Sequence, residues 1–216
     1  MSTTTAKTAR AYAGVSASDR VAARKARLLD AALELYGTQG YLATGVKDVC
    51  REAGVTDRYF YESFANSSQL FSAVFDRTTT ELLALVALGV GAAAPDPEAQ
   101  ARAAIETFVR TLADDPRKAR LLFAETASAG PAIEQHVRAT IRQFASLIAA
   151  TARAHLPAEI RDVVVQMGAH SLVGAIAGVI VEWQAGGLDA SIDEVIDYFV
   201  DVFTAAGAAA GLKGAR

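Results

Sequence analysis

The chain has little of what builds a disulfide framework, a metal site or an enzyme active centre. Its one cysteine, Cys50, cannot form a disulfide within the chain, which is typical of a protein from a reducing compartment, so we predict a cytoplasmic location. Its three histidines have no metal-ligand spacing, and no glycine-rich phosphate loop follows a strand pattern. We therefore expect no catalytic residues, no metal and no cofactor, and predict that the protein is not an enzyme.

Signals for β-strands are also sparse. No Asn-Gly or Asp-Gly turn separates apolar stretches, and alternating apolar runs are few. Hydrophobic residues make up 52% of the 216 residues but aromatic residues only 7%, which favours helices packed closely through Ala, Leu and Val. The sequence predicts an all-α protein of about nine helices, long enough for a small domain followed by a larger one.

Charge is distributed unevenly along the chain. The formal net charge is -3, yet residues 1–77 carry a net +2 and residues 78–216 a net -5. Residues 1–18 lack the apolar core of a signal peptide and contain Lys7 and Arg10. We predict a disordered basic arm there; contacts of that arm with DNA phosphates or the minor groove are the alternative. The polarity suits a DNA-facing end joined to an acidic body.

Residues 46–64 have the pattern of two short helices joined by a tight turn. Val46, Val49, Cys50 and Ala53 recur at the spacing of one helical face. Gly54 follows where a helix ends with positive φ, and Thr56 can cap the next helix. Phe60 and Phe64 are the predicted buried anchors of that second helix, which leaves polar and aromatic side chains outside. A helix-turn-helix directed at the major groove explains this surface.

Matches across three predicted helices resemble the DNA-binding domain of the tetracycline-repressor (TetR) family. They are Ala-Arg-Lys-Ala-Arg-Leu-Leu-Asp-Ala-Ala-Leu-Glu-Leu-Tyr (23–36), Gln39-Gly40-Tyr41, Ala43-Thr44, residues 46–64 and Leu70. The resemblance covers the first third of the chain; the remainder is similar only in its helical pattern and length. Ser67 stands where many members carry a DNA-contacting Lys, and Arg58-Tyr59 where a small Gly-Thr pair is frequent. The resemblance implies a one-component regulator with a ligand-binding body.

Arg58 is the first candidate for reading a base, because bidentate contact to guanine is the commonest specific pairing. Tyr59 is expected to contact a thymine methyl or a sugar, and Tyr61 is expected at a phosphate, with a packing role as its alternative. Thr44 is also expected to cap the first motif helix. The full set expected at DNA is Arg24, Lys25, Thr44, Lys47, Thr56, Asp57, Arg58, Tyr59 and Tyr61.

The predicted domains are the arm (1–18), the helix-turn-helix domain (19–66), a helical effector-binding and dimerisation domain (67–210) and a tail (211–216), with fraying expected from Ala205. Asn66 with Gln69 and Ser191 with Glu194 have capping-box spacing. Helices are expected over 19–38, from Leu70 past Val86, over 98–113, 116–128, 132–155 and 163–183, and from Ile192. The effector pocket is expected between these helices, and its candidate residues are Phe123, Glu125, Gln143, Phe144, Gln166, Met167 and His170.

Residues 163–183 are apolar on nearly all sides and could be mistaken for a membrane span. Four polar side chains and the lack of flanking anchor pairs favour a helix buried against its own body and a second subunit, so we expect no membrane. With the last helix it would form a two-fold four-helix interface. The residues expected in this interface are Gly174, Gly178, Val181, Ile192, Ile196, Phe199 and Phe203.

These features predict a transcriptional regulator, a repressor, that binds a palindromic double-stranded operator as a homodimer and is released by a small hydrophobic or amphipathic effector. Two alternatives are a helical protein-interaction module and an orphan DNA-binding regulator without an effector. Salt-dependent DNA binding would exclude the first alternative, and a thermal shift with hydrophobic ligands the second.

Overall fold

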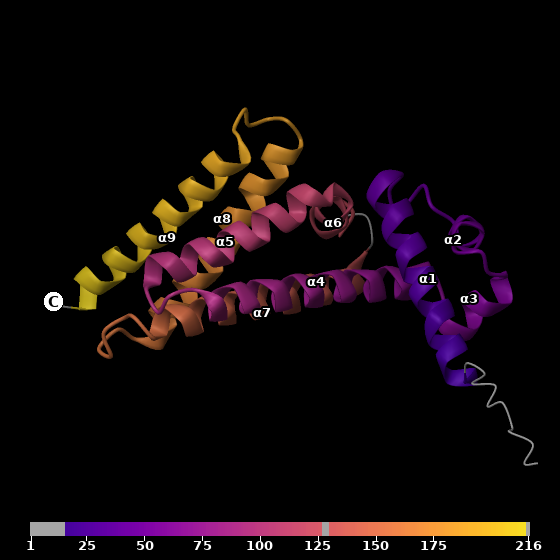
Figure 1. Cartoon of the computed structure of the whole chain (residues 1–216), viewed down its shortest axis with the longest axis horizontal. Helices are drawn as coiled ribbons and strands as arrows, with labels where there is room; N and C mark the ends of the chain where they lie inside the picture. Colours follow the sequence, from indigo (N-terminus) through magenta and orange to yellow (C-terminus); the bar gives the residue numbers. More distant parts are fainter. Residues whose placement is uncertain (1–15, 127–129, 215–216) are drawn as a thin grey trace, which may run out of the picture.

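The computed structural model describes residues 16–126 and 130–214, and within these ranges it contains helices and no strand, which confirms the all-α prediction. The N-terminal helices form one end of the molecule and the remaining helices an elongated body (Figure 1). The elements are α1 (Ala17–Thr38), α2 (Val46–Ala53), α3 (Asp57–Ser63), α4 (Ser67–Ala92), α5 (Pro97–Asp114), α6 (Pro116–Ala119), the π-helical η1 (Arg120–Ala124), α7 (Pro131–Arg153), α8 (Asp162–Gln184) and α9 (Ile192–Gly214).

Side-chain caps set the helix starts. The hydroxyl of Ser16 accepts from the N–H of Asp19 at 3.0 Å, so α1 begins two residues before its predicted start. Asn66 caps α4 as its spacing predicts, accepting from the N–H of Gln69 at 2.9 Å. At the other end α9 continues to Gly214, past the expected start of fraying at Ala205. Residues 1–15 of the predicted arm and 215–216 of the predicted tail lie outside the described residues.

Helices α1 to α3 enclose a small core of their own. Leu28, Val49 and Phe60 are almost fully buried within it, and the ring of Tyr36 packs 5.5 Å from that of Phe71 at the start of α4. Gly54 ends α2 with φ 62°, a conformation that glycine adopts without steric cost, and this lets α3 leave at a sharp angle. The predicted helix-turn-helix is therefore present.

Helix α4 belongs to both halves of the molecule. Its N-terminal half, with Leu70, Phe71 and Val74 buried, packs on α1, while Leu82 and Val86 are buried farther along, where α5 and α7 pack against it. Figure 1 shows it running lengthwise from the N-terminal unit through the body. A shift of the body helices against α4 would therefore reach the helix-turn-helix.

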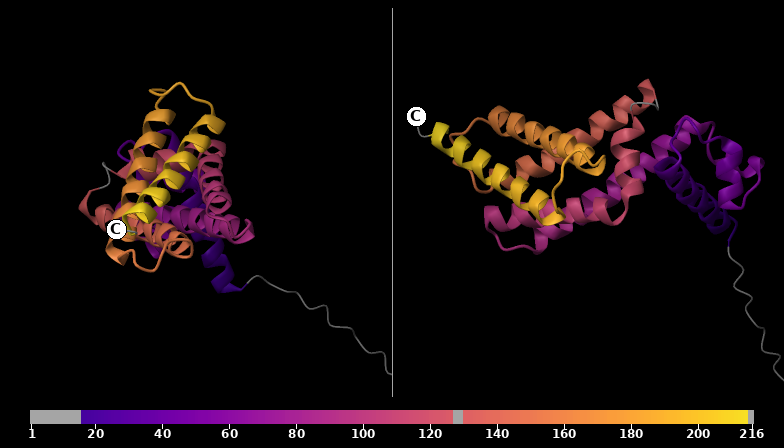
Figure 2. Two further views of the ribbon diagram at one scale, coloured as in Figure 1. Left: turned by 90° about the vertical axis from the view of Figure 1, so that its left-hand side faces the viewer. Right: turned by 90° about the horizontal axis from the view of Figure 1, so that it is seen from above.

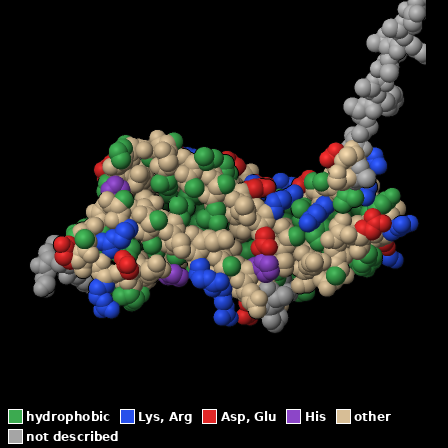
Figure 3. All heavy atoms as spheres, turned by 90° about the horizontal axis from the view of Figure 1, so that it is seen from below, with side chains coloured by type: hydrophobic (Ala, Val, Ile, Leu, Met, Phe, Trp, Pro, Cys, Tyr) green, Lys and Arg blue, Asp and Glu red, His purple; other side chains and the backbone are tan. Residues whose placement is uncertain are grey.

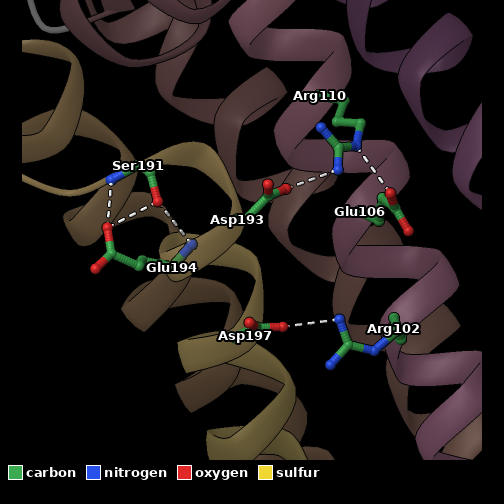
Figure 4. A network of polar contacts seen from close by, with 7 residues as sticks. All are labelled: Arg102, Glu106, Arg110, Ser191, Asp193, Glu194 and Asp197. Carbon is green, nitrogen blue, oxygen red and sulfur yellow. Dashed lines mark hydrogen bonds and ion pairs between the residues drawn. The ribbon is translucent and has the colours of Figure 1, made fainter.

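Helix α9 packs on α5 and α8 packs on α7, and α8 and α9 lie side by side along the body (Figure 2). Ion pairs at the rim tie α9 to α5: Arg102 to Asp197 and Arg110 to Asp193, both at 2.8 Å (Figure 4). Glu194 accepts from the N–H and hydroxyl of Ser191, which confirms that capping box. Such exposed pairs add little stability, so the buried apolar face of α9 does most to hold it.

One predicted helix differs in the structure. The chain was expected to be helical over 116–128, but α6 gives way after one turn to the π-helical turn η1, and Glu125 follows with its side chain buried. Residues 127–129 of that prediction are outside the described part of the chain. This short unit packs on the C-terminal end of α1 and is the second connection, besides α4, between the body and the N-terminal domain.

Candidate nucleic-acid interface and internal cavity

Helix α3 buries one side and exposes the other. Phe60 and Phe64 are 0% and 3% exposed, as the sequence predicts. On the outer side the side chain of Arg58 is 85% exposed, Tyr61 is 61% exposed and Tyr59 is 38% exposed. A helix of seven residues is not stable alone, so the core holds it with these groups turned outward. This is the geometry that a recognition helix needs.

Glu62 neutralises cations on this surface. Its carboxylate lies 3.1 Å from Nε of Arg58 and 4.0 Å from the guanidinium of Arg24. The Arg24 guanidinium also stacks 4.3 Å from the ring centre of Tyr59 and thereby holds that ring in place. Lys25 is exposed, with its ammonium 5.6 Å from the ring centre of Phe64. Because exposed pairs contribute little free energy, a phosphate or base can replace Glu62 at small cost.

Thr44 differs from its expected placement. Its side chain is buried, and its hydroxyl donates to the carbonyl of Gly40 at 2.7 Å, so its hydrogen is not available to a phosphate. The prediction that Thr44 caps the first motif helix is wrong: Gly45 is the N-cap of α2, and its N–H donates to Asp48 at 3.0 Å. The hydrogen bond from the Gly45 N–H contributes most, and the hydrogen bond from the Arg51 guanidinium second, to holding the pKa of Asp48 below its usual range.

The remaining polar candidates are at the surface. Lys47 on α2 is exposed. Thr56 is the N-cap of α3, but its hydroxyl makes no capping hydrogen bond and stays available. Asp57 is exposed too, and accepts from the thiol of the buried Cys50. The structure thus brings Lys47, Thr56 and the outer side of α3 to one end of the molecule.

A cavity of about 910 Å³ runs through the body. Its walls come from α4, α5, η1, α7, α8 and α9, and its lining is mostly aliphatic and aromatic, with Phe75, Phe108 and Ile176 among the residues that face it. Along α4 the lining extends from Phe75 to Val90, a helical rise of about 22 Å. This volume and lining are typical of a site for an apolar small molecule.

Only two of the seven predicted effector residues line this cavity. Phe123 and Phe144 do, and the Phe144 ring packs edge-on to Phe108 at 5.6 Å. Gln143, Gln166, Met167 and His170 are exposed and lie outside the lining. His170 uses its Nδ1 in a 2.8 Å contact with the carbonyl of Gln166 on its own helix.

Glu125, the remaining candidate, lies at the junction with the N-terminal domain instead. It is 8% exposed and accepts from the backbone N–H of Tyr41 at 2.7 Å and from Nε of Arg120 at 3.0 Å. Arg120 also donates to the carbonyl of Thr38 at 2.7 Å. The η1 segment therefore faces the cavity with Phe123 and holds the loop after α1 with Glu125.

The predicted interface residues divide into two groups. Ile196 and Phe199 are buried within this chain, and Ile192 and Phe203 are partly buried against the same core, so α9 uses this side to pack on its own body. Gly174, Gly178 and Val181 are exposed on α8. They continue a stripe of exposed residues at helical spacing, which we call the α8 stripe: Val163, Met167, His170, Gly174, Gly178 and Val181.

By length and composition α8 is also the one helix of the described chain that could cross a membrane, and little of it is buried. Apolar side chains likewise reach the surface of the body on the face seen in Figure 3, between charged groups at its two ends.

No group of histidine, cysteine and carboxylate side chains that could hold a metal ion is found within residues 16–126 and 130–214.

Two cavity residues were not singled out from the sequence. His155, just after α7, contacts the side-chain oxygen of Gln100 on α5 through Nε2 at 2.9 Å, and both line the cavity. They are 55 residues apart, and neither lies in a motif. No signal in a single sequence would have paired them.

The comparisons agree with this geometry. Residues 28–74 match the family described as "Bacterial regulatory proteins, tetR family". A 115-residue stretch is 29% identical to the HTH-type transcriptional activator FasR of Mycolicibacterium smegmatis; it spans 53% of this chain and about half, 52%, of that relative.

Solved structures similar to the whole fold include two regulators named FadR. The fatty acid degradation regulator FadR of Bacillus halodurans has a TM-score of 0.72 at 14% identity, over 83% of this chain and 94% of that one. FadR of Bacillus subtilis, solved with stearoyl-CoA, has a TM-score of 0.72 at 15% identity, over 82% and 96%. A TetR-like regulator from Rhodococcus sp. RHA1 has a TM-score of 0.66 at 20% identity, over 83% and 93%. Residues 28–74, which include the helix-turn-helix at residues 46–64, therefore form a DNA-binding domain of the TetR family type, and the fold around it is similar to that of TetR-like regulators.

Proposed function

We propose that the protein is a ligand-responsive regulator that binds a palindromic DNA operator as a homodimer and is released from it by a long-chain acyl compound. The observation that carries this proposal is the pairing of an outward-facing recognition helix with a large apolar cavity, joined through α4 and η1. A chain with this activity works in the cytoplasm, where the DNA is.

On the DNA side, α3 enters the major groove with Arg58 toward a base edge and Tyr59 beside it. Lys47, Thr56, Tyr61 and the exposed Lys25 contact phosphates, which position the domain without reading sequence. Arg24 supports the Tyr59 ring, since its guanidinium already stacks on it at 4.3 Å.

The second subunit covers the α8 stripe. An apolar stripe with two glycines at i and i+4 lets a second helix approach closely, and a Cβ added at Gly174 or Gly178 meets nothing within 4 Å in the single chain. A two-fold axis through this stripe places the two recognition helices on successive half-sites, which is why the operator is palindromic. We assign the apolar surface of α8 to this interface and not to a membrane.

For the effector we propose a long acyl chain. The cavity is long and apolar, and a protein of the same fold was solved with stearoyl-CoA. The effector acts by population shift: it favours a dimer in which the spacing of the recognition helices no longer matches the operator. For this it must bind the DNA-free dimer more tightly than the DNA-bound one.

The test is binding to DNA that flanks the protein's own coding region, at two salt concentrations and with excess nonspecific competitor. We expect tight, competitor-resistant binding to a palindrome. Arg58→Ala should weaken binding to this site by about 1–3 kcal/mol and relax one base position. Arg138→Ala, which removes an exposed arginine on α7, is the matched control and should change nothing. Equal loss on every sequence with Arg58→Ala would leave only nonspecific electrostatic binding and contradict the base-reading role.

A further inference from the structure

The cavity has an apolar end and a polar end. Toward the N-terminal domain its lining includes Phe75, Leu122 and Phe123, and the hydroxyl of Thr126 there donates to the carbonyl of Phe123. Toward the opposite end, where the α4–α5 and α7–α8 connections lie (Figure 1), its lining includes Gln100 and His155. Pro157 and the start of α5 are exposed there, so the cavity meets solvent at this end, which we call the mouth. An amphipathic ligand would place its head at the mouth and its tail against η1.

No lysine or arginine belongs to the described lining. The charged residues of the lining at this end are Asp96 and Glu98, both exposed, and beside them Arg153 donates to the carbonyls of Leu156 and Pro157. A carboxylate taken out of water needs a cation or several hydrogen-bond donors to offset its lost hydration. Arg153 is engaged by these backbone carbonyls, and the described lining itself supplies no cationic side chain to a carboxylate. A free fatty acid, ionised at neutral pH, therefore does not suit the mouth.

The hydrogen-bonding groups of the lining are mostly engaged. The hydroxyls of Thr79, Thr126, Thr151 and Thr204 donate to carbonyls of their own segments at 2.9 to 3.3 Å. At the mouth, Nε2 of His155 donates to the amide oxygen of Gln100 at 2.9 Å, because that oxygen can only accept. Among the described residues no acceptor takes the amide N–H groups of Gln100. They are donors for a ligand, and His155 fixes their direction.

Resting on the proposed function, we propose that the cavity selects a long acyl chain whose head is an uncharged carbonyl linkage, an ester or a thioester, over the free acid. Gln100, oriented by His155, donates to the carbonyl oxygen of that linkage. The acyl chain runs along α4 from the mouth toward Phe75 and Phe123. The end of the tail then touches η1, the segment that also holds the loop after α1 through Glu125.

The experiment compares three probes with the same chain: palmitate, 1-monopalmitoylglycerol and palmitoyl-CoA. Binding to the full-length protein is measured below micelle concentrations by displacement of an environment-sensitive dye, at about pH 8, where the acid is ionised. We expect at least one of the two esters to bind about tenfold or more tightly than palmitate. The stronger ester identifies the source, a lipid ester or a CoA thioester. Palmitate binding as tightly as both esters overturns the proposal.

Variants at the mouth test the role of Gln100. Gln100→Leu should weaken ester binding about tenfold and leave palmitate unchanged, because only the ester uses the amide donor. Gln100→Lys should strengthen palmitate binding about tenfold by supplying the missing cation, a gain that misfolding cannot produce. Gln143→Leu, on the exposed side of α7 outside the lining, is the control. Unchanged ester binding in Gln100→Leu, or no gain for palmitate in Gln100→Lys, would refute the assignment.

Failure of this inference is distinguishable from failure of the proposed function. If none of the three probes binds while the protein still binds its operator, the effector is not a long-chain acyl compound, and the proposed preference for an ester is refuted as well. If palmitate binds as well as the esters and releases the operator, the proposed function stands and only the selectivity is wrong.

Discussion

Cys50 lies on the buried face of α2, 2% exposed, with its thiol donating to the carboxylate of Asp57. Burial first, and the negative charge of Asp57 second, raise the pKa of this thiol to about 11. The thiolate is the reactive form of cysteine, so a thiol that stays protonated is inert. Cys50 therefore acts as a small apolar side chain that ties α2 to the start of α3.

This shift predicts how stability depends on pH. An unfolded cysteine loses its proton near pH 8.5, while folded Cys50 keeps it to about pH 11, so the folded state binds more protons in this window. The free energy of unfolding should fall as pH rises, by up to about 1.4 kcal/mol per unit from this group. Denaturant unfolding between pH 8.5 and 10 measures it, and Cys50→Ala should flatten the slope. An identical slope in the variant would contradict the shifted pKa.

At the scale of elements, α6 and η1 form a second link between the body and the N-terminal domain, besides α4. Arg117 pairs with Glu34 of α1 at 2.5 Å and with Asp115 at 2.8 Å, and both carboxylates raise the pKa of its guanidinium. Glu125 holds the N–H of Tyr41, as described above. An added Cβ at Gly37 would lie 2.4 Å from Cβ of Arg117, so only glycine lets the two segments approach this closely. Movement of η1 is thereby passed to the end of α1.

Glu125→Ala tests this link. The change leaves the Tyr41 N–H without its acceptor and removes the partner of Arg120, so the free energy of unfolding should fall by about 1–3 kcal/mol. Glu134→Ala, which removes an exposed pair with Arg138 on one helix, should change it by less than about 0.5 kcal/mol. The variant lacks one of the two links between the cavity and the DNA-binding domain. The effector should therefore release the operator less effectively, while the affinity for the operator in the absence of effector should change less. Both quantities can be measured by titration of labelled operator. Unchanged release would mean that α4 alone couples the sites.

The helices themselves were predictable because their signals are local. Asn66 and Ser191 cap helices through side chains three residues from the groups they bind, and Phe60 and Phe64 show which side of α3 is buried. Which side of α8 and of α9 packs on the body, and which side lies on the outside, was not predictable. Both helices are apolar around most of their circumference, so periodicity cannot tell a cavity wall from an outer face. Met167 and His170 were assigned to the pocket for this reason, and Ile196 and Phe199 to a subunit interface.

At the scale of the molecule, the single chain leaves a large apolar area uncovered on α8. Met167 is 66% exposed, Val163 46% and Val181 43%. Apolar patches of this kind on a soluble protein usually mark an interface. A partner helix that covers the α8 stripe would remove them from water and would also shield the cavity wall at Gly178, because that residue belongs to both surfaces. Dimerisation and effector binding would then be energetically linked.

Gly174→Arg separates dimerisation from folding. Nothing lies within 4 Å of an added Cβ at Gly174, and arginine favours helix over glycine by nearly 1 kcal/mol, so the single chain should remain folded. Placed in the two-fold interface, however, two guanidinium groups would face each other without partners. Sedimentation should show half the mass of the parent protein, and affinity for the palindrome should fall at least about tenfold because each half-site then binds separately. Gly91→Arg, at an equally open glycine in α4, is the matched control and should stay dimeric. A Gly174→Arg protein that sediments as a dimer would place the interface elsewhere than the α8 stripe.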